Sequence, residues 1–326
     1  MKKCLYLTLI ILFYITNFQA QCWLKLSSNH EHALAIKADS SLWQWGGNLY
    51  SFERALRTPT LIDSLNNWME VSTGKGFYAA IKTDGTLWTW GENTYGQVGN
   101  GTTTNLWTPT QLGTENNWLK IECGSDFMLA IKNDGTIWTW GKNRTSSPTQ
   151  IETDTDWIKI YSGTNKSFGI KSDLSLWQLL PTSASLFNNS QWETVSLGNN
   201  QNHGIKVDGT LWEWGNGFPS QVGTESNWKK SSDSHSNHSL FIKTDGTLWG
   251  AGYNLFGQVG VGSIINVTSP TQIGTDNNWL SINAGDNYSL ALKTNRSLWA
   301  WGKNNHAQFG NGKNKNRPQP IDTTTH

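Results

Sequence analysis

The stretch Ile81-Lys-Thr-Asp-Gly-Thr-Leu-Trp-Thr-Trp-Gly91 decides the fold of this chain, because it recurs in recognisable form seven times. Every copy keeps lysine at its second position and tryptophan at its eighth. Six copies keep aspartate at the fourth position, where Asn295 stands in the last copy. The copies begin at Ile36, Ile81, Ile131, Ile170, Ile205, Ile242 and Leu292. This regularity indicates seven structural units of one kind.

A second tryptophan precedes each copy. These residues are Trp23, Trp68, Trp118, Trp157, Trp192, Trp228 and Trp279. The distance from this tryptophan to the start of the repeated stretch is 13 residues in six units and 14 in the unit that begins at Trp228. Such a constant spacing indicates fixed secondary structure between the two landmarks.

Four strands are predicted in each unit. The first follows the upstream tryptophan, and the second runs into the repeated stretch. A turn such as Asp84-Gly85 leads to the third strand, because Asp-Gly between apolar β-formers is typical of hairpins. The fourth carries one proline per unit, which predicts an edge strand because proline cannot donate to a ladder. These prolines are Pro59, Pro109, Pro148, Pro181, Pro219, Pro270 and Pro318.

Four strands recurring about every 43 residues predict an all-β fold, a seven-bladed β-propeller of four-stranded antiparallel blades. We expect residues 21–326 to form this single domain. Six of the seven residues just before the repeated stretch are small, as close packing of neighbouring sheets requires. The seven residues are Ala35, Ala80, Ala130, Gly169, Gly204, Phe241 and Ala291, of which only Phe241 is large.

Residues 1–20 have the pattern of a signal peptide, with Lys2 and Lys3 before an apolar run that ends near Ala20. We therefore expect a secreted or periplasmic protein. Loss of the two lysines would change the formal charge from +1 to −1. A near-neutral chain without a basic stripe lacks the usual footprint of nucleic-acid binding or of attachment to an anionic membrane.

The loops and turns resemble the regulator of chromosome condensation repeat. Trp90-Gly91 is followed by the Gly-Gln loop Asn93–Gly101, with similar loops at 254–262 and 304–312, and Gly74–Phe77 matches the turn of that family. The resemblance spans residues 23 to about 322, although the third to fifth units lack the Gly-Gln loop. It implies a seven-bladed propeller. The best-known activity of that family is guanine-nucleotide exchange on a small GTPase in the nucleus. The expected signal peptide argues against this activity here. Similar secreted bacterial propellers include a protein inhibitor of β-lactamases.

The loops between third and fourth strands differ in length. From the end of the third strand to the proline, the distances are 13, 18, 7, 1, 4, 18 and 16 residues in units one to seven. The long loops belong to units one, two, six and seven, which are contiguous around a closed ring. This asymmetry suggests a protein-binding face, since binding residues often lie on loops. Neutral drift of surface loops is the alternative.

Residues near the first turn of each unit face the same side as these loops. We predict a protein partner of unknown identity, a monomeric scaffold without enzymatic activity, and contacts through His32, Tyr95, Trp107, His238, Phe256 and Tyr288. Phe77 and Phe127 are instead expected to cap the channel and pack on each other. A carbohydrate-binding or enzymatic propeller that uses Tyr95, Trp107 and Phe256 is the alternative, and a nucleotide-exchange factor ranks last.

No catalytic, metal or cofactor motif emerges from the sequence. His235-Ser-Asn-His238 with nearby Asp233 has metal-ligand character but fits a polar turn better. The aspartates of the repeated stretch are explained by tight turns, and its lysines are expected to be solvated neighbours of those turns. Cys22 and Cys123 fall in nonadjacent units, so we predict no disulfide between them. Each unit contains four strands of its own, which predicts ring closure without a donated strand.

Overall fold

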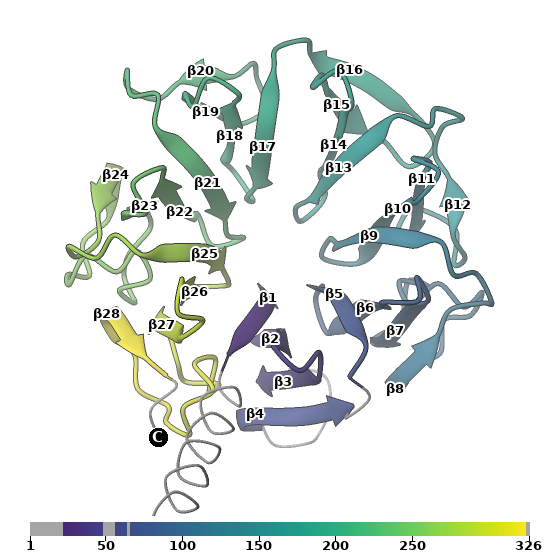
Figure 1. The fold of residues 1–326 in the computed structure, drawn as a ribbon, viewed down its shortest axis with the longest axis horizontal. Helices are drawn as coiled ribbons and strands as arrows, with labels where there is room; N and C mark the ends of the chain where they lie inside the picture. The colour runs from purple at the N-terminus through teal and green to yellow at the C-terminus, as the bar shows by residue number, and fades with distance from the viewer. Residues whose placement is uncertain (1–21, 48–55, 64–65, 324–326) are drawn as a thin grey trace, which may run out of the picture.

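The computed structural model describes residues 22–47, 56–63 and 66–323. In this part of the chain, seven four-stranded antiparallel sheets stand in a closed ring, each formed by consecutive strands (Figure 1). The predicted seven-bladed β-propeller is confirmed. The expected signal peptide, residues 1–20, lies outside the described residues. The described residues contain no helix that is long and apolar enough to cross a membrane.

The strand bounds show how regularly the units repeat. The first strands, which line the axis, are β1 (Trp23–Asn29), β5 (Trp68–Thr73), β9 (Trp118–Cys123), β13 (Trp157–Ser162), β17 (Trp192–Leu197), β21 (Trp228–Asp233) and β25 (Trp279–Ala284). The second strands are β2 (His32–Lys37), β6 (Phe77–Lys82), β10 (Phe127–Lys132), β14 (Ser167–Lys171), β18 (Asn202–Lys206), β22 (His238–Lys243) and β26 (Tyr288–Lys293).

The outer half of each blade holds the remaining two strands. The third strands are β3 (Leu42–Gly46), β7 (Leu87–Gly91), β11 (Ile137–Gly141), β15 (Leu176–Leu179), β19 (Leu211–Trp214), β23 (Leu248–Gly252) and β27 (Leu298–Gly302). The fourth strands are β4 (Leu56–Asp63), β8 (Leu106–Gln111), β12 (Thr149–Gln150), β16 (Ala184–Asn188), β20 (Ser220–Gln221), β24 (Val267–Gln272) and β28 (Arg317–Asp322).

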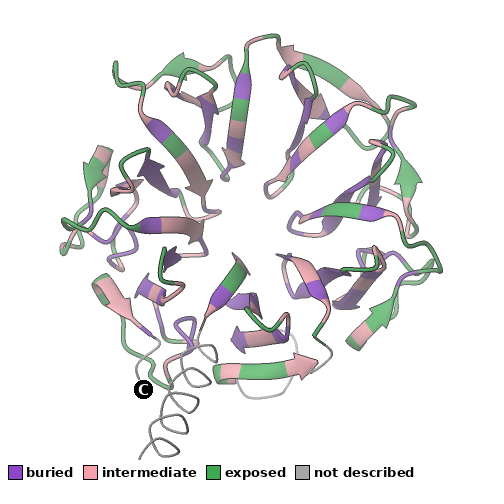
Figure 2. Cartoon of the chain, viewed as in Figure 1, coloured by how far each residue is buried: buried purple, intermediate pink, exposed green. Residues whose placement is uncertain are grey.

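The proline-bearing strands form the outer edge, as predicted, and exposed residues follow them around the rim (Figure 2). The proline lies inside the strand in blades 1, 2, 6 and 7. In blades 3, 4 and 5 it stands just before a shorter strand, at Pro148, Pro181 and Pro219.

The turn between second and third strands uses the repeated aspartate as predicted. In blade 2, Asp84 Oδ1 accepts hydrogen bonds from the Thr86 backbone N–H at 3.0 Å and the Thr86 hydroxyl at 2.7 Å. Gly85 occupies the left-handed region at φ 82°, which glycine adopts without strain. The indole Nε1–H of Trp88 then donates to Thr86 Oγ1 at 3.0 Å. The other six blades repeat this chain of hydrogen bonds, with Ser in place of Thr in three of them and Asn295 in place of Asp in blade 7.

The expectation that the repeated lysines are solvated is wrong. Strand register places each lysine opposite the first tryptophan of its blade, as in the pair Trp118 and Lys132. The Lys132 ammonium lies 4.7 Å from the ring centre of Trp118 and 3.7 Å from that of Trp138. Five of the seven lysines are buried, and every one has two such tryptophan rings within 5.4 Å.

The hydrophobic core lies between blades. One cluster joins Phe77, Ala79 and Ile81 of blade 2 to Trp118 and other residues of blade 3, and similar clusters fill the other junctions. The two glycines before the repeated stretch, Gly169 and Gly204, make room for the first tryptophan of their own blade rather than for a neighbouring sheet. At Gly204, for example, a Cβ atom would lie 2.3 Å from the ring of Trp192.

The ring closes without a donated strand among the described residues, as predicted. Blade 1 contains β1–β4 and blade 7 contains β25–β28. The Trp23 backbone N–H donates to the Arg296 carbonyl at 3.3 Å, which is the same bond that the first tryptophan of every other blade makes to the preceding blade. Trp23 and Trp45 of blade 1 pack with Tyr288 and Phe309 of blade 7. The seam is thus a junction like the other six.

Neither cysteine of the described chain forms a disulfide, in agreement with the prediction. Cys123 is buried at the end of β9, and burial raises the pKa of its thiol.

Candidate binding surfaces

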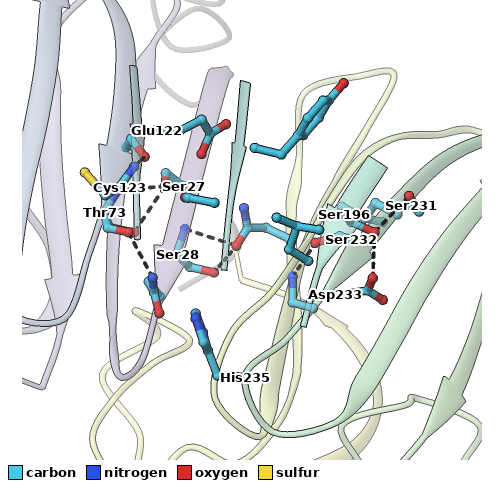
Figure 3. A pocket seen from close by; sticks show the side chains of 18 of the residues that line it. Ser27, Ser28, Thr73, Glu122, Cys123, Ser196, Ser231, Ser232, Asp233 and His235 are labelled. Atoms are coloured by element: carbon cyan, nitrogen blue, oxygen red, sulfur yellow. Dashed lines mark hydrogen bonds between the residues drawn. The ribbon is translucent and has the colours of Figure 1, made fainter. Parts of the chain in front are cut away.

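The ends of the seven first strands enclose an axial cavity of about 270 Å³ (Figure 3). Its lining is rich in hydroxyl groups, among them Ser27, Ser72 and Ser196. Glu122 also faces this space, where burial, reinforced by nearby Glu70, raises the pKa of its carboxyl to about 8. Asp233 is fully engaged by blade 5: its carboxylate accepts from the Ser196 hydroxyl at 2.8 Å and from the His203 backbone N–H at 2.9 Å, and pairs with His203 Nδ1 at 2.8 Å.

The local cluster considered in the sequence separates in three dimensions, which agrees with its interpretation as a polar turn. His238 is buried between the hydroxyls of Ser234, at 2.8 Å, and Ser289, at 2.9 Å. Burial lowers the pKa of His238 to about 3. His235 turns instead to the axis, where it lies at the edge of the cavity (Figure 3).

Around the axis, His235 meets His30 of blade 1 and Asp286 of blade 7. The two imidazole rings have centres 5.4 Å apart. His30 Nε2 lies 3.9 Å from Asp286 Oδ2, and His235 Nδ1 lies 3.9 Å from Asp286 Oδ1. Burial lowers the pKa of both histidines, and Asp286 opposes this effect. Sequence reasoning missed this group because its members are far apart in the chain, although all three lie seven residues after the first tryptophan of their blade.

A buried asparagine holds the long loop in each of blades 2, 6 and 7. Asn93 Nδ2–H donates to the Thr102 and Thr104 carbonyls at 3.0 Å each, while its Oδ1 accepts from the Val98 N–H at 2.9 Å. Asn254 and Asn304 hold the loops of blades 6 and 7 in the same way. The corresponding blade 1 loop includes residues 48–55, which lie outside the described residues.

These loops also stabilise the following blade, which gives their length a structural role besides binding or drift. The blade 2 loop crosses to blade 3, where Gln97 O accepts from Trp140 Nε1–H at 3.0 Å. The blade 7 loop does the same for Trp45 of blade 1, through Gln308 O at 2.9 Å. Backbone hydrogen bonds of 2.9 Å also join each loop to the next blade. The N–H groups of Gly101, Gly262 and Gly312 donate to the carbonyls of Ser146, Pro318 and Arg57, respectively.

The six predicted contact residues fall into two groups. His32, His238 and Tyr288 are buried, so their side chains offer no surface to a partner in this structure. Tyr95 is 46% exposed, and Phe256 is half-buried on the blade 6 loop. Trp107 is 52% exposed but belongs to β8 on the outer rim rather than to a loop.

The expected mutual packing of Phe77 and Phe127 is not observed. Both rings are buried, yet they belong to the cores of different blade junctions. The Arg144 guanidinium lies over Phe127 at 4.0 Å.

A group of three exposed apolar residues on one loop was not predicted from the sequence. Leu255, Ile264 and Ile265 of the blade 6 loop are 54%, 58% and 74% exposed. The signal was present as two adjacent isoleucines inside a Gly- and Ser-rich loop, where turn residues would be expected.

Two family models match parts of the sequence. Both describe the regulator of chromosome condensation (RCC1) repeat, one at residues 84–131 and 245–292, the other at 70–97, 118–145 and 279–308. The chain carries RCC1 repeats. The matched segments come from blades 2, 3, 6 and 7. No curated protein matches the sequence.

Solved structures share the RCC1-type ring at low sequence identity. Prp20p from Saccharomyces cerevisiae has a TM-score of 0.76 at 16% identity, over 93% of this chain and 87% of that chain. The CRINKLY WD40 ectodomain of the Arabidopsis thaliana receptor kinase ACR4 has a TM-score of 0.55 at 14% identity, over 86% of this chain and 98% of that one. These likenesses extend the fold assignment around the whole ring.

Proposed function

We propose that this protein is a secreted or periplasmic scaffold without enzymatic activity that binds another protein through the blade 6 loop. The observation that carries the proposal is the exposure of Leu255, Ile264 and Ile265 on a loop fixed by buried Asn254. Rigid apolar side chains bind with little loss of conformational entropy, which makes such a loop a good anchor for a protein interface. Tyr95 on the blade 2 loop extends the same face.

Similar propellers support the protein-binding class. The Prp20p structure was described with its binding properties to Gsp1p and histones, and yeast RCC1 (Prp20) has been seen bound by Kap60. The near-neutral charge of this chain disfavours nucleic acid as its own partner.

A pair of matched variants tests the binding site. Ile265→Asp places a charge on the blade 6 loop, and Leu186→Asp places one on β16, where Leu186 is 52% exposed on the opposite half of the ring. We expect a partner captured from secreted or periplasmic extract to bind the wild type and Leu186→Asp equally and to lose at least tenfold in affinity for Ile265→Asp. Equal binding by all three proteins would place the interface elsewhere.

The localisation is tested separately. Expression with the native leader should yield a secreted chain whose N-terminus, by sequencing, is Gln21. A chain that retains Met1 inside the cell would remove the secreted assignment without affecting the binding test.

A further inference from the structure

The axial end of the ring brings together one residue from each blade. This residue lies in the turn between the first and second strands, seven residues after the first tryptophan of the blade. The seven are His30, Lys75, Ser125, Thr164, Asn199, His235 and Asp286. Blades 6, 7 and 1 are consecutive in the ring, and these three supply His235, Asp286 and His30. One ligand atom from each lies within 4.8 Å of the other two.

The tautomer of His30 is fixed by its neighbours. Asn29 Nδ2–H donates to the Thr73 carbonyl at 3.1 Å, so Asn29 Oδ1 must be the atom that faces His30 Nδ1 at 2.8 Å. An amide oxygen only accepts, and therefore His30 Nδ1 carries the proton. His30 Nε2 is left with its lone pair directed at Asp286. A second hydrogen bond that orients the imidazole in this way is typical of metal-ligating histidines.

Two atoms of the cluster are buried without a hydrogen bond. His235 Nε2 and Asp286 Oδ1 have no such partner among the described residues. His238, three residues from His235, differs because both of its ring nitrogens are satisfied. Buried polar atoms that lack partners are rare and indicate a ligand or ion that completes them.

We propose that His30, His235 and Asp286 bind a divalent transition-metal ion, with Zn²⁺ as the best match. Two imidazoles and one carboxylate are ligands of catalytic and structural zinc, whereas Ca²⁺ and Mg²⁺ take mainly oxygen. A tetrahedral zinc ion with bonds of about 2.0 Å separates its ligand atoms by about 3.3 Å. One ligand atom from each of the three residues now lies within 4.8 Å of the other two, so side-chain rotations would have to close the remaining gap. The fourth ligand position would be open to water.

The position of this site gives it a structural role. Blades 7 and 1 hold the two ends of the described chain, and their turns already touch through the Asp286 N–H and the His30 carbonyl at 3.2 Å. An ion bound here would join both ends of the ring and the neighbouring blade 6. Zinc binding should therefore stabilise the closed ring by mass action.

Zinc titration of the chelator-treated full chain tests the proposal. Calorimetry with zinc chloride should show one site per chain, and excess zinc should raise the thermal midpoint by a few degrees. His235→Asn and Asp286→Asn should each weaken binding at least tenfold and abolish the thermal shift. The control His306→Asn removes a half-buried loop histidine of blade 7 that pairs with Glu31 and not with the cluster, and it should bind zinc like the wild type. Absence of a zinc site in the wild type, or loss of binding only in His306→Asn, would overturn the proposal.

A spectroscopic test with a cysteine variant does not depend on the stability of the asparagine variants. Asp286→Cys would place a thiolate in the first coordination sphere, so Co²⁺ should give a sulfur-to-cobalt charge-transfer band that the wild type lacks. A folded Asp286→Cys protein without this band would place the metal elsewhere and refute the site.

Discussion

Replacing Lys132 with methionine tests whether the lysines that lie between two tryptophan rings stabilise the blades. Methionine keeps most of the aliphatic stem and removes the charge, so the packing of the stem changes little. The Lys132 ammonium lies 4.7 Å and 3.7 Å from the ring centres of Trp118 and Trp138. Its side chain is only 5% exposed, and it bonds to Glu115 Oε1 at 2.7 Å.

The magnitude follows from these contacts. Two partly desolvated cation–π contacts contribute roughly 0.5 to 2 kcal/mol each. Glu115 is 52% exposed, so the ion pair adds at most about 1 kcal/mol. The cost of burying the ammonium offsets part of this sum. We expect Lys132→Met to lower the free energy of unfolding by about 2 kcal/mol.

Urea unfolding followed by tryptophan fluorescence measures this loss. Lys315→Met is the matched control, because Lys315 is exposed, and it should change stability by less than about 0.5 kcal/mol. Glu115→Gln, which removes the ion pair and leaves both tryptophan contacts, should cost much less than Lys132→Met if the tryptophans dominate. If Lys132→Met lowers the free energy of unfolding no more than Lys315→Met does, the contacts between Lys132 and the two tryptophans contribute nothing to stability.

Three further predictions concern pH, a turn and a loop. His238, buried with a pKa of about 3, binds no proton in the folded state between pH 6.5 and 4, so acidification over this range should lower stability by about 1.4 kcal/mol per pH unit. Glu122, whose pKa is raised to about 8, acts in the opposite sense, and Glu122→Gln should therefore steepen the loss in urea midpoints measured from pH 6.5 to 5; an unchanged slope would contradict its raised pKa. Ser40 has φ 63° where four other blades have glycine, so Ser40→Gly should raise the unfolding free energy by about 1 kcal/mol, and a fall in the thermal midpoint would contradict this. Trp140→Phe removes the bond to the blade 2 loop and should cost about 1 kcal/mol and speed proteolysis of that loop, whereas Trp214→Phe should do neither, because the Trp214 indole N–H has no acceptor among the described residues.

The architecture was predictable because its signals are local and repeated. The 13-residue interval between Trp118 and Ile131 recurs in five other units and is one residue longer in the unit that begins at Trp228, so it fixes a hairpin of nearly constant length. The Asp-Gly turns and edge prolines then set the order of strands. Closure followed from counting complete units. None of these inferences needed a distance between residues of different blades.

The errors arose where such distances matter. Lys132 appeared solvated because it is charged and lies near a turn, but a bulge at the start of β9 places it beside Trp118. The metal candidates were sought within one turn, whereas His30 and Asp286 meet His235 only because the first turns of all blades converge on the axis. His32 and Tyr288 seemed exposed for the same reason, since the depth of a turn in the ring is not visible in sequence.

The long loops of blades 2 and 7 each cover a tryptophan of the blade that follows, so the repeat visible in sequence is not the unit that shields itself from water. A cut at the repeat boundary leaves Trp140 bare, and a cut inside the blade 2 loop separates β7 from its partner β8. A single blade therefore cannot be excised with both its four-stranded sheet and the loop that covers its tryptophan intact. The smallest piece of this ring that should fold in a concerted way is a pair of neighbours, and adding or losing blades in evolution would have to respect that pairing.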